Sequence, residues 1–402
     1  MGTYLDSIPS SGIIRIRDLM YTVPNPFRLD QGDVSFDAPD TVKAGMRRAI
    51  DENRSHYAQT AGLPRLRELL ADKLRRKNGV PVGGPDEVLV TNGGVHGIYL
   101  AFQALLEPGD EVIVPDPQWP QTAGTILAAH GVLVRCPLHA SLDWRLDVAE
   151  VRSMITPRTR AIYLNSPHNP TGGVLTRQDI EALASLAREH GIWLVSDEAY
   201  EDVVFEGEHV SPASLPGMHD RTISIFTFSK SYAMTGLRLG YLAIKDAALR
   251  ERMMKILALT TSNVSPVVQH GGIAGLEGSQ AVVERYRQEL LARRDLFYAG
   301  IDALGGVLSG RPPRGAFYAF LAIDRDWRRR ASRLASAASD SSEAASLSWA
   351  LAEYLIRQGR VGCIPGADFG PSGEGFLRFC FARDRSELTG ALSAMTELFP
   401  GA

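Results

Sequence analysis

Cysteine is scarce in this sequence, with Cys136, Cys363 and Cys380 as the only three among 402 residues. They lie far apart and their number is odd, which argues against a disulfide framework, and no pair has the spacing of a metal site. No apolar run approaches the ~18 residues that a membrane span needs, and the first residues lack the apolar core of a signal peptide. We therefore expect a reduced, cytoplasmic protein without a membrane partner.

An excess of charge of either sign is also missing. The net charge of −3 gives no reason to expect nucleic acid or an anionic membrane as a partner. Hydrophobic residues make up 45% and charged residues 22% of the chain, which is typical of globular proteins. A chain of this length should form two domains, or one large domain with an appendage.

What the sequence does contain, from about residue 86 onward, is an alternation of strand and helix patterns. Such an alternation predicts an α/β fold. A long helical stretch, 267–304, is expected to link two domains, and the Ala/Ser-rich residues 325–346 should form a mobile surface insertion or a lid. Strands are expected at 87–90, 111–114, 132–135, 161–164, 192–195 and 223–228, and helices at 40–52, 95–106, 146–155, 177–190 and 247–257.

The most informative stretch is 224–241, where an apolar run ends in hydroxyls beside one lysine. Burial disfavours the charged amine of Lys230, so its pKa should fall and its neutral form can attack an aldehyde. Thr227, Ser229 and Arg238 combine two hydroxyls with a fork-shaped cation and suit a phosphate. An amine that can attack an aldehyde, next to a site for a phosphate, fits pyridoxal 5′-phosphate. The alternative is that Lys230 is a surface lysine that merely closes a strand.

The run Ser-x-x-x-x-Ser-Lys followed by Gly-x-Arg-x-Gly-Tyr resembles the lysine signature of the fold-type-I, class I/II pyridoxal-phosphate aminotransferases. The resemblance extends from about Leu29 to Ala382 through several separate motifs in the family's order. It implies a large domain with a mixed, mostly parallel sheet flanked by helices, plus a smaller α+β domain built from both chain ends. The expected division is 1–45 as N-terminal arm and part of the small domain, 46–280 as the large cofactor-binding domain, and 281–402 as the small C-terminal domain.

A second anion site is indicated where two glycines precede the expected helix 95–106. Free N–H groups and the positive end of the helix dipole suit an anion there, and the Gly-x-Gly-x-x-Gly order of a dinucleotide site is absent. The resemblance assigns the N–H groups of Gly94 and Val95 to the cofactor phosphate. It also implies that Trp119 stacks on the pyridine ring, with a core tryptophan as the alternative.

Two further motifs follow expected strands, at whose carboxyl ends open α/β sheets bind ligands. In the first, Asn-Pro-Thr-Gly, the resemblance implies that Asn169 bonds the phenolic oxygen of the cofactor and contacts the substrate. In the second, Asp-Glu-x-Tyr, it implies that Asp197 pairs with the protonated pyridine nitrogen and Tyr200 bonds the phenolic oxygen. A protonated nitrogen makes the ring an electron sink. Glu198 is expected to be structural.

Four residues are candidates for contacts with the substrate or with a partner subunit. Arg378 lies among alternating apolar residues, where a charge is expensive unless it serves a function. The resemblance implies that it grips the α-carboxylate of the amino acid, with a buried ion pair as the alternative. Gly32 resembles the glycine of the substrate pocket, or a simple turn. Tyr57 and Asn263 match residues that relatives give to the neighbouring subunit, which implies a homodimer with shared active sites.

These residues together imply a pyridoxal-phosphate-dependent aminotransferase that moves an amino group from an L-amino acid to a 2-oxo acid by a ping-pong mechanism. Lys230 would hold the cofactor as an internal aldimine and then act as a general base. The same residues could instead support a β-lyase, a decarboxylase or an amino-acid oxidase. A non-catalytic regulatory domain is a further alternative, which the net charge disfavours. Acid-specific relatives often carry a lysine where this sequence has Val95, which favours a neutral or aromatic donor.

Overall fold

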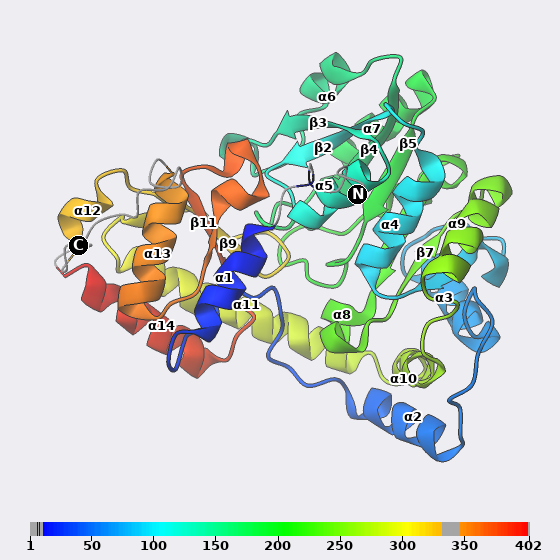
Figure 1. The fold of residues 1–402 in the computed structure, drawn as a ribbon, viewed down its shortest axis with the longest axis horizontal. Helices are drawn as coiled ribbons and strands as arrows, with labels where there is room; N and C mark the ends of the chain where they lie inside the picture. The colour runs from blue at the N-terminus through cyan, green and yellow to red at the C-terminus, as the bar shows by residue number, and fades with distance from the viewer. Residues whose placement is uncertain (1–5, 7, 9–10, 332–345, 401–402) are drawn as a thin grey trace.

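Two β-sheets organise the computed structural model, which describes residues 6, 8, 11–331 and 346–400 (Figure 1). The larger sheet has seven strands in the order β1-β7-β6-β5-β4-β2-β3. Its strands are β1 Val88–Thr91, β2 Glu111–Asp116, β3 Val132–Pro137, β4 Thr159–Asn165, β5 Trp193–Asp197, β6 Thr222–Thr227 and β7 Gly240–Ala243.

The large sheet is mixed but mostly parallel, as expected from the sequence. Only β7 runs antiparallel to its neighbours, β1 and β6, while every other pairing in this sheet is parallel. Parallel strands need long crossovers, and the helices of these crossovers cover the faces of the sheet. Strands β1, β2 and β7 are therefore buried along their whole length.

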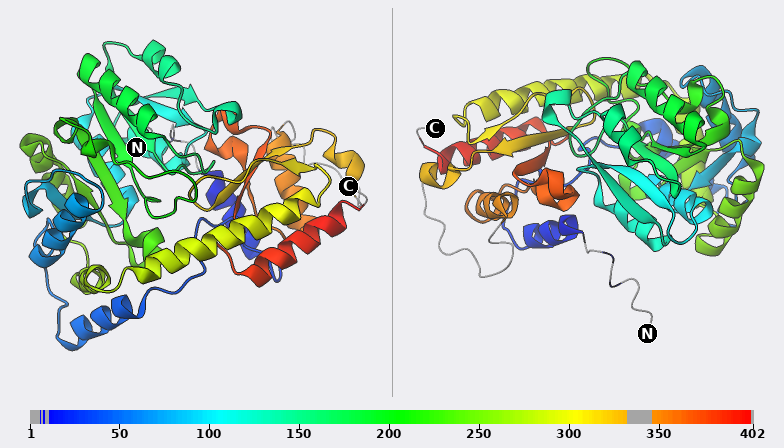
Figure 2. Two further views of the ribbon diagram at one scale, coloured as in Figure 1. Left: turned by 180° about the vertical axis from the view of Figure 1, so that it is seen from behind. Right: turned by 90° about the horizontal axis from the view of Figure 1, so that it is seen from above.

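Helices surround this sheet on both faces (Figures 1 and 2). The longest of its crossover helices, α7, starts with a capping box between Thr176 and Asp179 and ends at Gly191, whose φ of 69° suits glycine. The helices of this part are α2 Asp40–Asp51, α3 Pro64–Arg76, α4 Gly94–Leu105, α5 Pro120–Ala128, α6 Val148–Met154, α7 Arg177–His190, α8 Phe228–Ser231, α9 Ala247–Thr260 and α10 Pro266–Glu277.

The second, smaller sheet takes all four strands from the C-terminal part of the chain, and a helix from the N-terminal part packs against it, as expected for a small domain built from both chain ends. Its order is β10-β11-β9-β8, and all its pairings are antiparallel. Helix α1, near the N-terminus, buries Ile16 and Met20 in one cluster with Phe320 and Trp349. The elements of this part are α1 Gly12–Tyr21, α11 Ala281–Asp302, β8 Leu308–Ser309, β9 Tyr318–Ile323, α12 Trp327–Arg330, α13 Leu347–Gly359, β10 Ile364–Pro365, β11 Phe376–Cys380 and α14 Arg385–Leu398.

The stretch expected to be helical, 267–304, is helical with one interruption. The stretch forms two helices, α10 and the 22-residue α11, and the long α11 crosses from the large sheet to the small one (Figure 2). Gly278 leaves helical geometry at ψ 174°, and the side chain amide of Gln280 donates to the carbonyls of Gly275, at 3.0 Å, and Gly278, at 2.9 Å. These bonds satisfy carbonyl groups that the end of a helix leaves without partners.

The expected insertion at 325–346 lies largely outside the described residues, apart from 325–331 and 346. The three cysteines are free and buried. Among the described residues, no helix is both long enough and apolar enough to cross a membrane.

Candidate active site

The carboxyl ends of β4, β5 and β6 open into a cavity of about 540 Å³ that the small sheet closes from the other side. Ligands of open α/β sheets bind at such strand ends. The cavity is lined by twelve of the fourteen residues predicted from the sequence, and they come from segments up to 346 positions apart: Gly32, Gly94, Val95, Trp119, Asn169, Asp197, Tyr200, Thr227, Ser229, Lys230, Arg238 and Arg378.

Lys230 reaches the cavity from α8, a short helix that starts directly after β6. Its Nζ donates a hydrogen bond to the carbonyl oxygen of Gly32, at 2.6 Å, and lies 5.4 Å from the centre of the Phe317 ring. Burial lowers the pKa of Lys230 to about 8, while the nearby Asp33 carboxylate acts in the opposite direction. A substantial fraction of this amine is therefore neutral, and nucleophilic, near neutral pH.

An anion cradle lies beside Lys230, at the start of α4. The first N–H groups of a helix have no partner within the helix, and here they follow Gly93, whose φ is 79°. A Cβ atom on Gly93 would lie 2.5 Å from Nη2 of Arg238, so only glycine lets the guanidinium pack against this turn. The Thr227 and Ser229 hydroxyls lie 2.8 Å apart on the same side of the cavity. Arg238 forms no ion pair with any described residue, which leaves its charge available to an anion.

Asp197 ends β5 and is 7% exposed. Its Oδ2 accepts a hydrogen bond from the Tyr163 hydroxyl at 2.8 Å, and its Oδ1 accepts one from the Ala199 N–H at 3.2 Å. Burial nevertheless raises the pKa of Asp197 to about 6. The carboxylate has no cation within ion-pair distance among the described residues, although buried carboxylates normally have one. A cationic atom of a ligand in the cavity would satisfy it.

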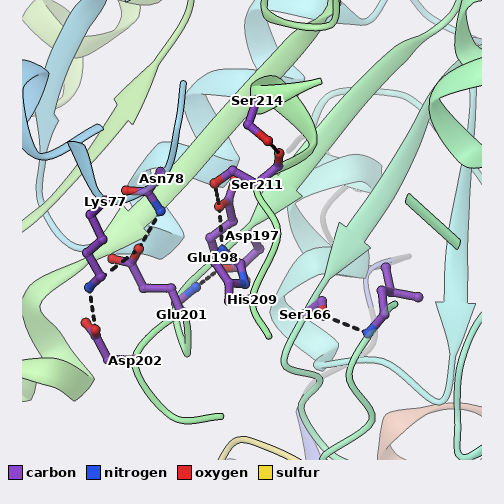
Figure 3. A network of polar contacts seen from close by, with 12 residues as sticks. Lys77, Asn78, Ser166, Asp197, Glu198, Glu201, Asp202, His209, Ser211 and Ser214 are labelled. Carbon is purple, nitrogen blue, oxygen red and sulfur yellow. Dashed lines mark hydrogen bonds and ion pairs between the residues drawn. The ribbon is translucent and has the colours of Figure 1, made fainter. Parts of the chain in front are cut away.

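Glu198, the residue after Asp197, has a different environment. Oε2 of Glu198 accepts hydrogen bonds from Nε2 of His209, at 2.8 Å, and from the hydroxyl of Ser211 (Figure 3). Glu198 is 1% exposed and does not line the cavity. These contacts fix the loop that follows β5, which agrees with the structural role expected for this residue.

Tyr200 joins the two sheets across the cavity. Its hydroxyl lies 2.7 Å from that of Tyr318 on β9, and burial raises the pKa of both, so both phenols stay protonated. A Cβ atom on Gly32 would lie 2.5 Å from the Tyr318 hydroxyl, which explains why glycine stands there. Asn169 is held through its backbone N–H, which donates to Oδ1 of Asn165 at 2.9 Å.

Arg378 lies on β11, is 2% exposed, and has no carboxylate partner among the described residues. Its Nη1 donates to Oδ1 of Asn169 at 3.2 Å, its Nη2 donates to the backbone oxygen of Asp30 at 2.6 Å, and its Nε has no partner. The buried ion pair considered as an alternative is therefore absent from the described part of the chain. An unneutralised guanidinium at a cavity is suited to bind an anionic ligand group.

Tyr57 and Asn263 are not brought into this cavity. The backbone N–H of Ala58 donates to Oδ1 of Asn263 at 3.4 Å, so the two segments lie side by side. Tyr57 is 89% exposed and does not line the cavity of its own chain. Their predicted role in a partner subunit stays a prediction.

Sequence reasoning missed several residues that line or support the cavity. Neither Tyr318 nor Tyr163 stands in a motif of the sequence, and Tyr163 is only one residue of the expected strand 161–164. Arg17 of α1 also lines the cavity, although the N-terminal segment shows no motif. No group of three or more His, Cys, Asp or Glu side chains that could hold a metal ion occurs in the described part of the chain.

Comparison with known proteins agrees with this geometry. The family model described as aminotransferase class I and II matches residues 24–395. The chain is 38% identical to an aspartate/prephenate aminotransferase of Thermus thermophilus over 90% of this chain and 88% of that protein. It is 32% identical to aromatic-amino-acid aminotransferase 2 of Thermococcus litoralis, over 98% and 97% of the two chains. Among solved structures, aspartate aminotransferase from Thermus thermophilus with maleate superposes with a TM-score of 0.88 at 34% identity, covering 99% of each chain.

Proposed function

This chain belongs to the class I and II aminotransferase family and is an aminotransferase, and we propose that it uses pyridoxal 5′-phosphate to move an amino group from an L-amino acid to a 2-oxo acid. The observation that carries the proposal is one cavity that gathers a buried amine, a buried carboxylate and an anion cradle. We propose ping-pong kinetics, in which donor and acceptor bind in turn.

The cavity fits this cofactor group by group. The phosphate would be held by the N–H groups at the start of α4 with Thr227, Ser229 and Arg238, and the pyridine nitrogen by Asp197. Trp119 would stack on the ring, and Asn169 and Tyr200 would bind its phenolic oxygen. When bound, pyridoxal phosphate supplies an aldehyde that combines with amines and a ring that withdraws electrons from the substrate Cα.

The chain's own residues then bind the substrate and move its proton. Arg378 grips the α-carboxylate, because it is a buried guanidinium at the cavity with no carboxylate partner in the described chain, and it lies on the small sheet, apart from the anion cradle. This grip holds the Cα–H bond toward Lys230. The Lys230 amine, with its pKa lowered to about 8, takes and returns the proton as a general base near neutral pH.

We further propose a homodimer in which Tyr57 and Asn263 complete the partner's cofactor site, since both lie outside the cavity of their own chain. Residues 46–280 would carry the cofactor, 281–402 would carry Arg378, and 1–45 would complete the small domain. Val95 at the start of α4 supplies no cation for a second carboxylate, which favours neutral or aromatic donors.

Spectroscopy of the purified holoenzyme tests the reaction. We expect an L-amino acid alone to convert the cofactor fully to its amine form, and a 2-oxo acid alone to restore the aldehyde form. Continuous release of ammonia or carbon dioxide without this cycle would instead support a β-lyase or a decarboxylase, and oxygen consumption an oxidase.

Borohydride reduction followed by peptide mapping tests the site. The cofactor should be attached to Lys230, and the Lys230→Ala variant should give no adduct. Lys255→Ala, which changes a lysine with a side chain 69% exposed, is the matched control and should label as the original protein does. An adduct at any other lysine would refute the assignment.

A further inference from the structure

A line of buried polar side chains leads to the Asp197 carboxylate from the side of β4 and α5. Buried polar groups almost always find hydrogen-bond partners, and here the partners are one another. The inference drawn from this line rests on the proposed function, because it concerns the residue that faces the pyridine nitrogen. Its members are all less than a tenth exposed: Thr171, His168, Gln118, Thr122, Tyr163 and Asp197.

The direction of the hydrogen bonds at the far end of the line follows from the protonation of His168. Burial lowers the pKa of His168 to about 3, so the ring is neutral and has one donor and one acceptor nitrogen. Its Nε2 lies 3.0 Å from Oε1 of Gln118, an atom that only accepts. Nε2 therefore carries the proton, and Nδ1 accepts from the Thr171 hydroxyl at 2.7 Å.

The remaining hydrogen bonds of the line also donate toward Asp197. The side chain amide of Gln118 donates to the Thr122 hydroxyl at 3.4 Å, and the Thr122 side chain acts to lower the pKa of the Tyr163 phenol, against the larger effect of burial. Tyr163 donates to Oδ2 of Asp197 at 2.8 Å, and burial keeps its pKa well above 10, so it remains a donor. Each of the four hydrogen bonds, Thr171 to His168, His168 to Gln118, Gln118 to Thr122 and Tyr163 to Asp197, thus donates toward the carboxylate, and hydrogen bonds in such a series polarise one another.

We propose that Tyr163 is a positioning residue that holds Asp197 ionised and directed at the pyridine nitrogen, with Thr122, Gln118 and His168 as the relay behind it. A carboxylate that accepts hydrogen bonds is a weaker base. The proton shared between Asp197 and the nitrogen therefore stays on the nitrogen, which keeps the ring electron-withdrawing. Of the neighbouring charges, Glu198 opposes the ionised state of Asp197 and Lys230 favours it.

The test is Tyr163→Phe, which removes only the hydroxyl, in holoenzyme reconstituted with pyridoxal phosphate labelled with ¹⁵N in the ring. The ¹⁵N chemical shift reports directly whether the nitrogen carries the proton. We expect a protonated nitrogen in the original protein and, in the variant, a shift of the proton equilibrium toward Asp197 by about tenfold or more. The kcat should fall while the KM for the amino donor stays within about twofold, because Arg378 is untouched.

Tyr298→Phe is the matched control, because Tyr298 is buried and its hydroxyl has no hydrogen-bond partner among the residues that the structure describes. This variant should leave the ¹⁵N shift and kcat unchanged. Thr122→Val, which interrupts the relay one link earlier, should move the ¹⁵N shift in the same direction as Tyr163→Phe but by less. It also carries the test on its own should Tyr163→Phe fail to fold.

Three results would overturn the inference: an unprotonated nitrogen in the original protein, an unchanged ¹⁵N shift in both relay variants, or an equal change in Tyr298→Phe. Each of these can occur while the original protein still cycles between its two cofactor forms, so the inference can fail alone. Failure of that cycle in the original protein would refute the proposed function itself.

Discussion

Two buried arginines, Arg378 and Arg293, lead to opposite expectations when each is replaced by methionine. Arg378 has no carboxylate partner in the described chain, and its Nη atoms bond an amide oxygen and a backbone oxygen. Arg293 is 5% exposed and pairs with Glu289 at 2.8 Å and with Asp384 at 3.5 Å. Arg378 is thus arranged to bind an anion, whereas Arg293 is already paired with two carboxylates.

The magnitudes follow from these contacts. A bidentate grip on a carboxylate consists of two charge-assisted hydrogen bonds of about 1.5–3 kcal/mol each, so Arg378→Met should lower kcat/KM for the amino donor by roughly 10²–10⁴-fold. The same change removes an unpaired buried charge, whose desolvation penalty of several kcal/mol offsets the loss of contacts with the Tyr318 and Phe369 rings. The free energy of unfolding should therefore be unchanged or higher.

Arg293→Met should instead lower the free energy of unfolding and leave kcat/KM nearly unchanged. It breaks a partly buried ion pair with Glu289, so the free energy of unfolding should fall by at least about 2 kcal/mol. Because Arg293 does not line the cavity, kcat/KM should stay within about threefold of the original value.

Urea unfolding and steady-state kinetics of both variants, run side by side, check these expectations. The reasoning about Arg378 is refuted if Arg378→Met loses 2 kcal/mol or more of stability while keeping kcat/KM within about tenfold. That combination would mean that the guanidinium supports the fold rather than the substrate.

Three further predictions follow from the other charged and exposed positions. Burial lowers the pKa of Lys230 from 10.5 to about 8, which disfavours its cationic form in the folded state. Lys230→Met should therefore stabilise the apoprotein at pH 6 by on the order of 2–3 kcal/mol. This gain should fade as the pH rises through 8, and urea titrations at several pH values would show it. Tyr57→Ala should weaken cofactor binding about tenfold, and a hybrid with a Lys230→Ala chain should regain one site of original affinity; equal weakness in the hybrid would place Tyr57 in its own chain's site. Val95→Lys should raise kcat/KM for aspartate relative to phenylalanine by about tenfold, and an unchanged ratio would show that this position does not contact the donor side chain.

The residues at strand ends could be predicted from the sequence because their positions follow from local patterns. Asp197 is the last residue of β5 and Asn169 lies in the turn that follows β4, and strands of a parallel sheet bring such positions to one edge. Lys230 and Arg238 share one motif, so their proximity required no knowledge of the tertiary fold. The alternation of strand and helix patterns predicted the α/β fold, whereas the mixed sheet was implied by the resemblance to a known family.

The contacts that the sequence could not reveal depend on packing between distant segments. Tyr163 lies in a strand that is buried on both faces, and its hydroxyl meets a carboxylate 34 positions further on. Nothing in a run of apolar residues distinguishes this tyrosine from a core aromatic. Arg17 reaches the cavity only because Ile16 and Met20 anchor α1 to the small sheet. The break between α10 and α11 depends on Gln280, which binds carbonyls that a continuous helical pattern hides.

The cavity gathers three ionisable groups whose burial is not compensated within the described chain. Burial moves the pKa of Asp197 up to about 6 and that of Lys230 down to about 8, so each group is shifted toward its neutral form, while Arg378 stays charged without a counter-ion. Functional sites commonly carry such uncompensated groups at the expense of stability. A cofactor with a ring nitrogen that can be protonated and an aldehyde, together with a substrate that carries a carboxylate, offers each of the three its missing partner. The cost of burying these three groups and the affinity of the cavity for such ligands therefore have the same physical origin.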